Sequence, residues 1–475
     1  MEITDVNRVI QSLSTETKAA LALLALCVGS RLLSAIYYIE DPDSLRFALS
    51  ILDYDVTRLQ PHFPAYPVFC WFVQLLTSLT GRYAVAFALV GGLSTWLVVM
   101  GLVRIAGEGL TGHRGLLIAT LVFFNPLIWL MGNRFMPDLL GLAFLMAAFY
   151  CVTTGHKPLW GGFLTGMLAG IRLSYLPFML VPALCHLAKG ARRLPFLVAI
   201  AAGSGIWLIP LIGITGWSEL VDAAKVQTGG HFSDFGGTVT TEPDLHSRMT
   251  GMVEGIWADG MGFYWADRHP STIVATLALC IGIVPSLVRN LGGSTIGASF
   301  WIKAASWTVY LCWVFLAQNV VYKSRHVLPL IPFVLLAVVA AWSADAPLKT
   351  LRRTALGVFL VVYAYVTLNL AVQHTQPSAI AQIKDYLQAK SNADLHIVTV
   401  PLVEYYLSSQ GLEAVYMTIE DETDRQSLDQ IPREASIVAI GNPYAFPGRN
   451  LKYQRRFYHN PYVNRMWPEI GVYEY

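Results

Sequence analysis

Residues 40–67 hold the densest group of side chains in this chain that could do acid–base chemistry. Five acids lie in this stretch, directly after an apolar run long enough to cross a membrane: Glu40, Asp41, Asp43, Asp53 and Asp55. Charges at membrane depth are costly and usually functional, which favours a site over a linker. A carboxylate within hydrogen-bond reach of an acceptor hydroxyl can remove its proton as a general base.

Other polar side chains border or interrupt the apolar runs further along the chain. They are His62, Asp138, Arg172, His231, Arg325 and His326. A phosphate leaving group needs fixed cationic donors, for which the arginine guanidinium has the best geometry. Carboxylates beside arginine and histidine at an apolar wall would therefore suit transfer from a lipid-anchored phosphate that arrives sideways from the bilayer.

The elements that must position these residues are transmembrane helices. Of the 475 residues, 55% are apolar and 13% are charged, whereas a soluble domain has roughly 25% charged residues. We predict an α-helical polytopic membrane protein with about 11 to 12 transmembrane helices, because apolar runs of about 20 residues recur. The run 65–79 is about 15 residues long and should not cross completely. The longer runs are 18–39, 83–103, 115–131, 139–154, 159–186 (broken near Arg172), 194–214, 271–288, 302–321, 327–342 and 354–371.

Two parts of different character divide the chain. Residues 1–372 form the transmembrane module, with a first external loop at 40–64 and a long polar external loop at 215–270. Residues 373–475 are predicted to be a small soluble α/β domain, because helix-like pieces alternate with short apolar strands. We expect a helix at 379–390 and strands at 395–400, 414–419 and 436–440.

Basic clusters set the expected orientation, because Lys and Arg are in excess in short cytoplasmic loops. These clusters lie at 104–114, 156–157, 189–193, 289–303 and 349–353. The acidic stretch, the turns at 133–138 and 323–326, the long loop and the C-terminal domain then share the opposite side. We expect the bacterial inner (plasma) membrane, with the site and the C-terminal domain on the periplasmic or extracellular face.

Five segments in the same order resemble the GT-C glycosyltransferases. The likeness is to the protein O-mannosyltransferase family (family 39) and the bacterial lipid A aminoarabinose transferases. D-S-L-R-F-A at Asp43–Ala48 and Q-P-H-F-P-A-Y-P at Gln60–Pro67 resemble their first external loop. Phe124–Asp138 resembles their second acidic element, Gly166–Pro177 their Gly-rich helix ending in Arg, and S-R-H-V-L-P-L-I-P at Ser324–Pro332 the entry to a late span.

The resemblance implies a donor and a set of roles. In that family an Asp of the first loop is the catalytic base, and a polyprenyl-phosphate sugar is the donor. By position Asp43 matches that base, with inversion at the anomeric carbon, and Asp138 and Asp41 are further catalytic candidates. The residues expected to bind the donor phosphate or the substrate are His62, Tyr66, Arg172, His231, Arg325 and His326.

Two positions depart from the family pattern, and one signature is absent. Ser44 stands where many members have a second acid, so a paired-carboxylate mechanism is in doubt. His62 stands where some members have Lys, so phosphate binding there would be weaker or pH-dependent. The W-W-D signature of oligosaccharyltransferases is absent, which argues against transfer of a pyrophosphate-linked oligosaccharide to Asn.

Several candidates also have a purely structural explanation. Asp41 or Asp43 could cap a helix that starts at Leu45. Asp138 follows Pro137 and could simply begin a helix. Arg325 could be a charge that reaches the interface along its own aliphatic stem. Asp53 and Asp55 are expected to be solvated loop residues.

We therefore predict a glycosyltransferase (EC 2.4 class) that moves a single sugar to a hydroxyl acceptor, which can be a lipid, a glycan or a protein. A polytopic transporter or lipid-linked sugar flippase is the alternative, and it predicts charges spread across the mid-bilayer and an internal repeat. A non-catalytic envelope scaffold is a third interpretation, in which Asp43 would be dispensable.

The sequence assigns no cofactor. A divalent metal is possible because Asp43, Asp138 and a histidine could converge, but their spacing matches no ligand motif. The six cysteines all lie in apolar segments without a Cys-x-x-Cys pair, which indicates neither a disulfide framework nor a metal site. Membrane lipids are expected partners, and a net charge of +2 predicts no nucleic-acid partner.

Overall fold

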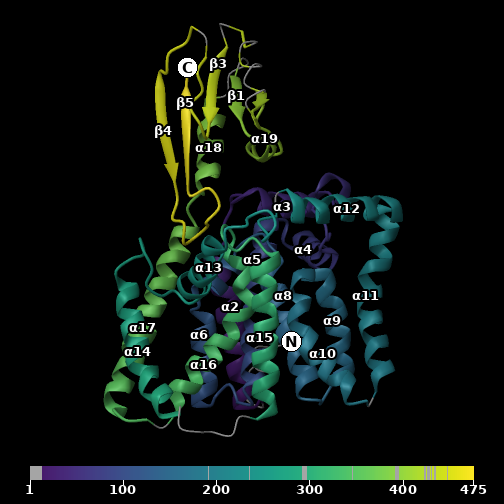
Figure 1. The fold of residues 1–475 in the computed structure, drawn as a ribbon, viewed down its shortest axis with the longest axis vertical. Coiled ribbons are helices and arrows are strands. Elements are labelled where there is room, and N and C mark those ends of the chain that lie inside the picture. Colours follow the sequence, from purple (N-terminus) through teal and green to yellow (C-terminus); the bar gives the residue numbers. More distant parts are fainter. Residues whose placement is uncertain are drawn as a thin grey trace, which may run out of the picture.

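A helical membrane module carries a small sheet domain at one of its ends (Figure 1). The computed structural model describes residues 13–475, apart from 191, 235, 291–296, 345, 391–394, 422–423, 425–427, 429–430, 433–434 and 447. The predicted fold class, a polytopic α-helical membrane protein with a C-terminal α/β domain, is confirmed.

Six helical segments in the described part of the chain are long and apolar enough to cross a membrane. They are Tyr83–Ile105 (α5), Pro158–Ala188 (α9 and α10), Arg193–Thr215 (α11), Ala298–Ala317 (α15), Ser324–Ser343 (η4 and α16) and Lys349–Gln388 (α17 and α18). Further helices pack among them: Thr15–Leu33 (α2), His113–Phe123 (α6), Pro126–Met131 (α7), Asp138–Thr153 (α8) and Ser271–Asn290 (α14).

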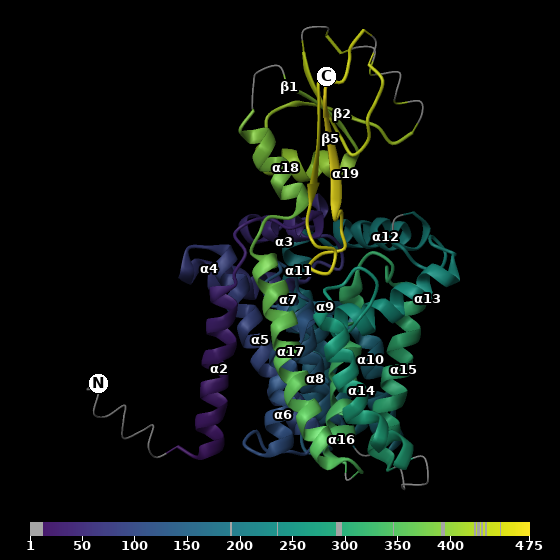
Figure 2. The same cartoon turned by 90° about the vertical axis from the view of Figure 1, so that its left-hand side faces the viewer.

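Short helices cover the end of the bundle that faces the sheet domain. Pro42–Leu52 (α3), Pro67–Thr80 (α4) and Trp217–Ser233 (α12) lie there, as Figure 2 shows. α3 starts where it does because the Asp41 side chain accepts a hydrogen bond from the Ser44 backbone N–H and Pro42 occupies the first turn. The 14 residues of α4 span about 21 Å, too little to cross a hydrocarbon core of about 30 Å.

The predicted break at Arg172 is present. α9 (Pro158–Arg172) ends there, the 3-10 turn Leu173–Tyr175 (η2) follows, and α10 begins at Leu176. This arrangement leaves the Arg172 side chain at a helix end inside the bundle, where it is buried.

Two predictions about helices were wrong. The run 115–131 is not one span but two helices, α6 and α7, because Asn125 caps the second helix and Pro126 cannot continue the first. The stretch 215–270 is not simply a loop. It contains α12, Leu245–Glu254 (α13) and the π-helix Gly255–Gly260 (η3). The sequence did not indicate these helices because the stretch is polar and Gly-rich and lacks a clear apolar period.

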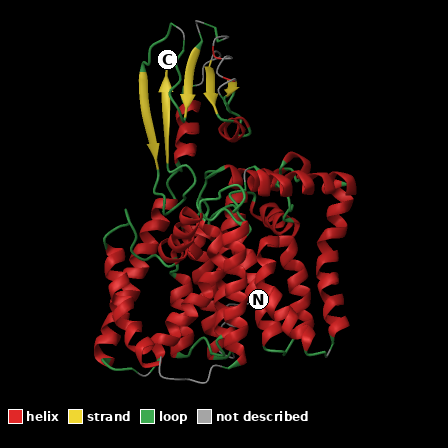
Figure 3. Ribbon diagram, viewed as in Figure 1, coloured by secondary structure: helices red, strands yellow, loops and turns green. Residues whose placement is uncertain are grey.

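The C-terminal domain has a five-stranded mixed sheet in the order β2-β1-β3-β5-β4 (Figure 3). The expected strands are present as Leu395–Thr399 (β1), Val415–Thr418 (β2) and Ser436–Ile440 (β3), all parallel, with Ala379–Gln388 (α18) and Pro401–Ser408 (α19) beside them. Sequence reasoning missed the antiparallel hairpin of Tyr453–Tyr458 (β4) and Glu469–Glu474 (β5). β4 is largely polar and exposed, so it lacks the apolar alternation of a half-buried strand.

The sheet domain packs directly on α3. Leu45 of α3 lies in one apolar core with Ile380 and Tyr406 of the C-terminal domain. Ser378 and Tyr406 also donate hydrogen bonds to the backbone carbonyls of Glu40 and Ile39. The C-terminal domain therefore covers the beginning of the acidic stretch, from Ile39 to Leu45.

The Asn125 side chain joins three helices at the α6–α7 break. It accepts from the Ile128 N–H and donates to Tyr363 Oη and the Gly260 carbonyl, at 3.0, 2.8 and 2.7 Å. We expect Asn125→Ala to lower the free energy of unfolding by about 2–4 kcal/mol, because a cap and two buried hydrogen bonds are lost. Thermal unfolding in detergent would measure this. Thr120→Ala, which removes only a bond within α6, is the control, and an equal melting temperature for both variants would contradict the prediction.

Candidate functional site

The Asp43 carboxylate lies between cationic side chains from a distant part of the chain. Its Oδ2 is 2.5 Å from Lys323 Nζ and 2.7 Å from Arg325 Nη2. Arg46, one turn along α3, is 3.6 Å from Oδ1. The first turn of α3 points the carboxylate toward the segment Ser324–Leu330 (η4), so α3 and the start of a late apolar helix share one ion-pair cluster.

The Asp43 side chain is charged in spite of its burial. Burial raises its pKa, but the nearby charges of Lys323, Arg325 and Arg46 outweigh burial and hold the pKa well below its usual value. Burial also lowers the pKa of His62 to about 3, although the Asp43 charge acts in the opposite direction. His62 is therefore a neutral ring at physiological pH, and can donate and accept one hydrogen bond each.

A second buried cluster forms around Arg172. Its Nη2 is 3.0 Å from Asp138 Oδ1 in the first turn of α8, and its Nη1 is 3.2 Å from Tyr66 Oη. Tyr66 Oη is in turn 3.2 Å from His62 Nε2, and Tyr175 Oη lies 3.4 Å from Asp138 Oδ1. The structure thus places four of the residues predicted from the sequence in one hydrogen-bonded chain.

The Phe47 ring on α3 lies between the two clusters. It meets the rings of His62 and Tyr66 edge-on, with centroids 5.8 and 5.0 Å apart. Asp43 and Phe47 are four residues apart on one helix, so they lie on the same face. One face of α3 therefore carries Asp43 on one turn, and on the next turn Phe47, which contacts the second cluster.

The other acids of the 40–67 stretch have different surroundings. Asp41 caps α3 with Oδ1 and accepts from Asn464 Nδ2 with Oδ2, at 3.1 Å. Glu40 is fully buried, 2.9 Å from Arg134 Nη2 and 3.2 Å from His374 Nε2. Asp53 and Asp55 instead pair with Arg58 at the surface, as expected of solvated acids.

The two remaining histidines are not part of the ion-pair clusters. His231 lies at the end of α12, with Nε2 2.8 Å from the Ala317 carbonyl oxygen. Within the described residues no hydrogen bond or ion pair joins it to Asp43, Asp138 or Arg172. His326 follows Arg325 and is buried, and its backbone carbonyl accepts from Tyr310 Oη.

Sequence reasoning missed several residues of this site. Lys323 makes the shortest contact to Asp43, and its position two residues before Arg325 was the available signal. Arg134, in the turn before Asp138, pairs with Glu40, but a sequence without the fold cannot indicate that pair. Asn464 and Arg465 belong to the C-terminal domain, and no local pattern associates them with the membrane module.

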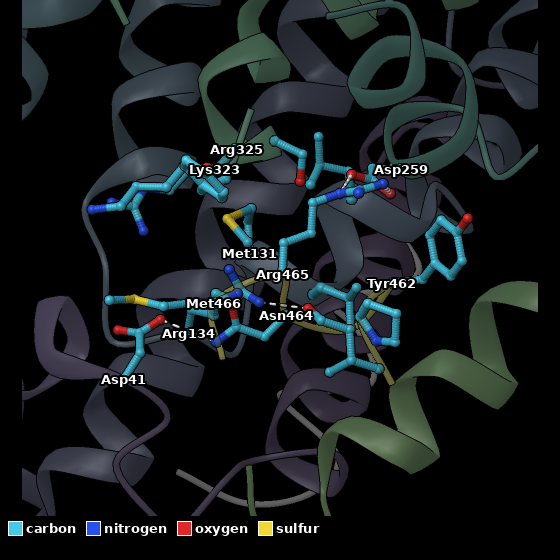
Figure 4. Close-up of a pocket in the computed structure, with 16 residues that line it drawn as sticks. Asp41, Met131, Arg134, Asp259, Lys323, Arg325, Tyr462, Asn464, Arg465 and Met466 are labelled. Carbon is cyan, nitrogen blue, oxygen red and sulfur yellow. Dashed lines mark hydrogen bonds and ion pairs between the residues drawn. The ribbon is translucent and has the colours of Figure 1, made fainter. Parts of the chain in front are cut away.

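A small polar cavity adjoins the Asp43 cluster (Figure 4). Its volume is about 20 Å³, room for about one water molecule. Its charged and polar lining comes from the membrane module and from the C-terminal domain: Asp41, Arg134, Asp259, Lys323, Arg325, Tyr462, Asn464 and Arg465. Among the described residues, no group of three His, Cys, Asp or Glu side chains has the arrangement of a metal site.

The fold is similar to that of a known enzyme. A crystal structure of ArnT from Cupriavidus metallidurans bound to undecaprenyl phosphate matches with a TM-score of 0.56 and 12% identity, over 95% of this chain and 97% of that one. The apo structure of the same protein matches with a TM-score of 0.43 and 14% identity, over 97% and 98% of the two chains. The first likeness confirms the resemblance in fold to the lipid A aminoarabinose transferases and their GT-C architecture.

Comparisons by sequence add nothing to this result. No protein-family model matches the chain, and a search of curated protein sequences finds no match.

The Glu40 pair should make stability depend on pH. Burial raises the pKa of Glu40, but Arg134 and His374 outweigh burial and lower it from 4.5 to about 2. A shift of this size corresponds to about 3 kcal/mol of stability, present above the unfolded pKa and lost as the pH falls from 4.5 toward 2. Chemical unfolding in detergent should show Glu40→Gln destabilised by at least this amount at pH 7, with the gap to wild type narrowing in acid. A gap that stays constant down to pH 3 would contradict the assignment.

Proposed function

We propose that this protein is a membrane glycosyltransferase that moves one sugar from a polyprenyl-phosphate donor to an acceptor hydroxyl. The observation that carries the proposal is a buried carboxylate, Asp43, paired with Lys323 and Arg325 beside a polar cavity at one end of an apolar bundle. A fold like that of ArnT, whose crystal structure holds undecaprenyl phosphate, supports a donor of this class.

The donor phosphate would compete with Asp43 for the same cations. Lys323 and Arg325 offer several N–H donors at the cavity, and a phosphate binds such donors more strongly than a single carboxylate does. Once they turn to the phosphate, Asp43 keeps its burial but loses its two nearest positive charges, and its pKa rises. The carboxylate then becomes a better base at the moment when the donor is in place.

The transfer step is a displacement at the anomeric carbon. The acceptor oxygen forms a bond to that carbon as Asp43 takes its proton, and the bond from carbon to phosphate oxygen breaks on the opposite face. The phosphate leaves with the bonding electrons, and Lys323 and Arg325 stabilise its added charge. This geometry inverts the anomeric centre, and Asp43 later returns its proton to water.

The second cluster would orient the site. Asp138 holds Arg172 by an ion pair, and Arg172 holds Tyr66 by a hydrogen bond. Neutral His62, at 3.2 Å from Tyr66 Oη, would contribute a hydrogen bond and no charge, so we assign phosphate binding primarily to Lys323 and Arg325.

A transporter is the weaker alternative. α3, which carries Asp43, lies at the end of the bundle next to the C-terminal domain (Figure 1), and Asp43 pairs with Arg325 there. We place the reaction on the extracytoplasmic face of a bacterial inner membrane, because the basic clusters of the sequence lie at the other ends of the helices.

Asp43→Asn tests the base. With a labelled polyprenyl-phosphate sugar, we expect the variant to lose at least about 100-fold in kcat, because a general base contributes roughly 10²–10⁴-fold. Donor KM should not rise, because the variant no longer competes with the phosphate for Lys323 and Arg325. Asp53→Asn, which alters a surface acid of the same stretch, should transfer like wild type. Undiminished transfer by Asp43→Asn would exclude this residue as the base, and a wild type that turns over no such donor would refute the function.

Lys323→Met tests the phosphate contact. We expect donor KM to rise about 10- to 100-fold, equivalent to the roughly 1.5–3 kcal/mol of a hydrogen bond to a charged group. Lys157→Met removes an exposed charge away from the site and should leave KM unchanged. An unchanged KM in Lys323→Met would show that the phosphate is held elsewhere.

A further inference from the structure

The loop between β4 and β5 reaches from the sheet domain into the mouth of the membrane module. It comprises residues 459–468, and Figure 2 shows it descending from the two yellow strands to the ends of the helices. In Figure 4 its residues Tyr462 to Met466 surround the cavity next to Lys323 and Arg325. A soluble domain thereby supplies a wall of a site whose charges belong to the membrane module.

Arg465 makes the strongest polar contact of this loop. Its Nε and Nη2 meet the two Asp259 carboxylate oxygens at 2.6 and 2.9 Å, and Nη2 is 2.8 Å from Glu254 Oε1. Glu254 is the last residue of α13 and Asp259 lies near the end of η3, both in the membrane module. A two-pronged contact of this kind fixes the direction of the guanidinium as well as its distance.

Two further contacts place the loop beside the base. Asn464 Nδ2 donates to Asp41, two residues before Asp43, at 3.1 Å. Arg134 Nη2 donates to the Val463 carbonyl. The loop therefore contacts the residue that caps α3, two positions before Asp43.

The polar contacts of the loop differ in their exposure. The hydrogen bond from Asn464 to Asp41 is buried. The Arg465 and Glu254 side chains are 19% and 17% exposed, whereas the Asp259 side chain is 4% exposed. Water can therefore reach the Arg465–Glu254 contact, and a loop that opens must leave Asp259 to other partners.

The cavity is smaller than a donor sugar. A donor phosphate on Lys323 and Arg325 would place its sugar in the cavity that these residues line. That cavity holds about 20 Å³, the space of about one water molecule, and a sugar ring is several times larger. The loop lines the cavity from Pro461 to Met466, so a displacement of the loop would enlarge it.

We propose that the β4–β5 loop is the movable wall of the sugar compartment, and that Arg465 holds it closed on Glu254 and Asp259. The loop opens to admit the donor sugar and closes over it, so that the acceptor hydroxyl and not water meets the anomeric carbon. This inference rests on the proposed glycosyl transfer and adds to it a gate and a residue that protects the donor from hydrolysis.

The fate of the donor sugar distinguishes a gate from a loop that only anchors the domain. With full-length protein and a labelled polyprenyl-phosphate sugar, we compare release of free sugar with transfer to acceptor, and we call the ratio of the two the partition. We expect Arg465→Ala to raise the ratio of hydrolysis to transfer at least about 5-fold, because an open wall admits water. Arg465→Lys keeps the charge but cannot make the bidentate contact, so its ratio of hydrolysis to transfer should lie between those of Arg465→Ala and wild type.

Arg456→Ala is the matched control. Arg456 lies in β4 of the same hairpin and pairs with Glu469, with side chains 68% and 50% exposed. Removing it should leave the partition at the wild-type value. A melting temperature in detergent for each variant shows whether a change in partition comes with unfolding.

A reversible cross-link tests the movement itself. Asp259→Cys with Arg465→Cys, joined by a short cleavable bis-thiosulfonate reagent, should lose at least about 10-fold in transfer, because the locked wall excludes the donor sugar. A reductant should restore transfer, and each single variant treated alike should not respond.

The outcomes distinguish the two proposals. Wild type that transfers sugar, together with a cross-linked variant that stays fully active or an Arg465→Ala that partitions like wild type, overturns the gate and leaves the transferase standing. Wild type that turns over no polyprenyl-phosphate sugar overturns both.

Discussion

The carboxylate of Asp43 is charged, buried and neutralised by cations that lie 280 and 282 residues away in the chain. A buried carboxylate without such partners would cost several kcal/mol, and it would take up a proton instead. The pairing with Lys323 and Arg325 therefore ties α3 to the segment that leads into α16. It also keeps these three charged groups together at the end of the bundle next to the C-terminal domain.

The attachment of the C-terminal domain to the membrane module also depends on contacts that α3 makes with distant parts of the chain. Its apolar contact with Leu45 and the hydrogen bonds to the backbone of residues 39 and 40 hold it on α3. The buried Glu40–Arg134 pair lies directly beneath this contact. The Arg465 pair with Glu254, by contrast, is partly exposed, although Asp259 is buried. The domain is thus attached through an apolar core on α3 and through a separate ion-pair contact of the β4–β5 loop.

Much of the helical module could be predicted because membrane spans are encoded locally. A run of apolar residues must form a helix in lipid, since no water is present to satisfy its backbone. The prediction of helix boundaries failed where individual residues, and not the apolar composition of the run, decided where a helix begins or ends. Asn125 and Pro126 divide one apolar run into two helices, and the polar stretch around Gly229 continues α12 without an apolar period. The β4–β5 hairpin escaped detection because its exposed strand gains its stability from pairing with β5.

For the site, the sequence by itself determined which kinds of residue were out of place: carboxylates and arginines beside apolar runs. It also placed Asp43, Asp138, Arg172 and Arg325 in segments that resemble one family. Only the tertiary structure decided the partners. Asp43 met Lys323 as well as Arg325, Asp138 met Arg172, and Asp41 became a helix cap bonded to Asn464. The reason is physical: the cost of isolating a charge is local to its residue, but its compensation comes from whatever the fold brings within about 3 Å.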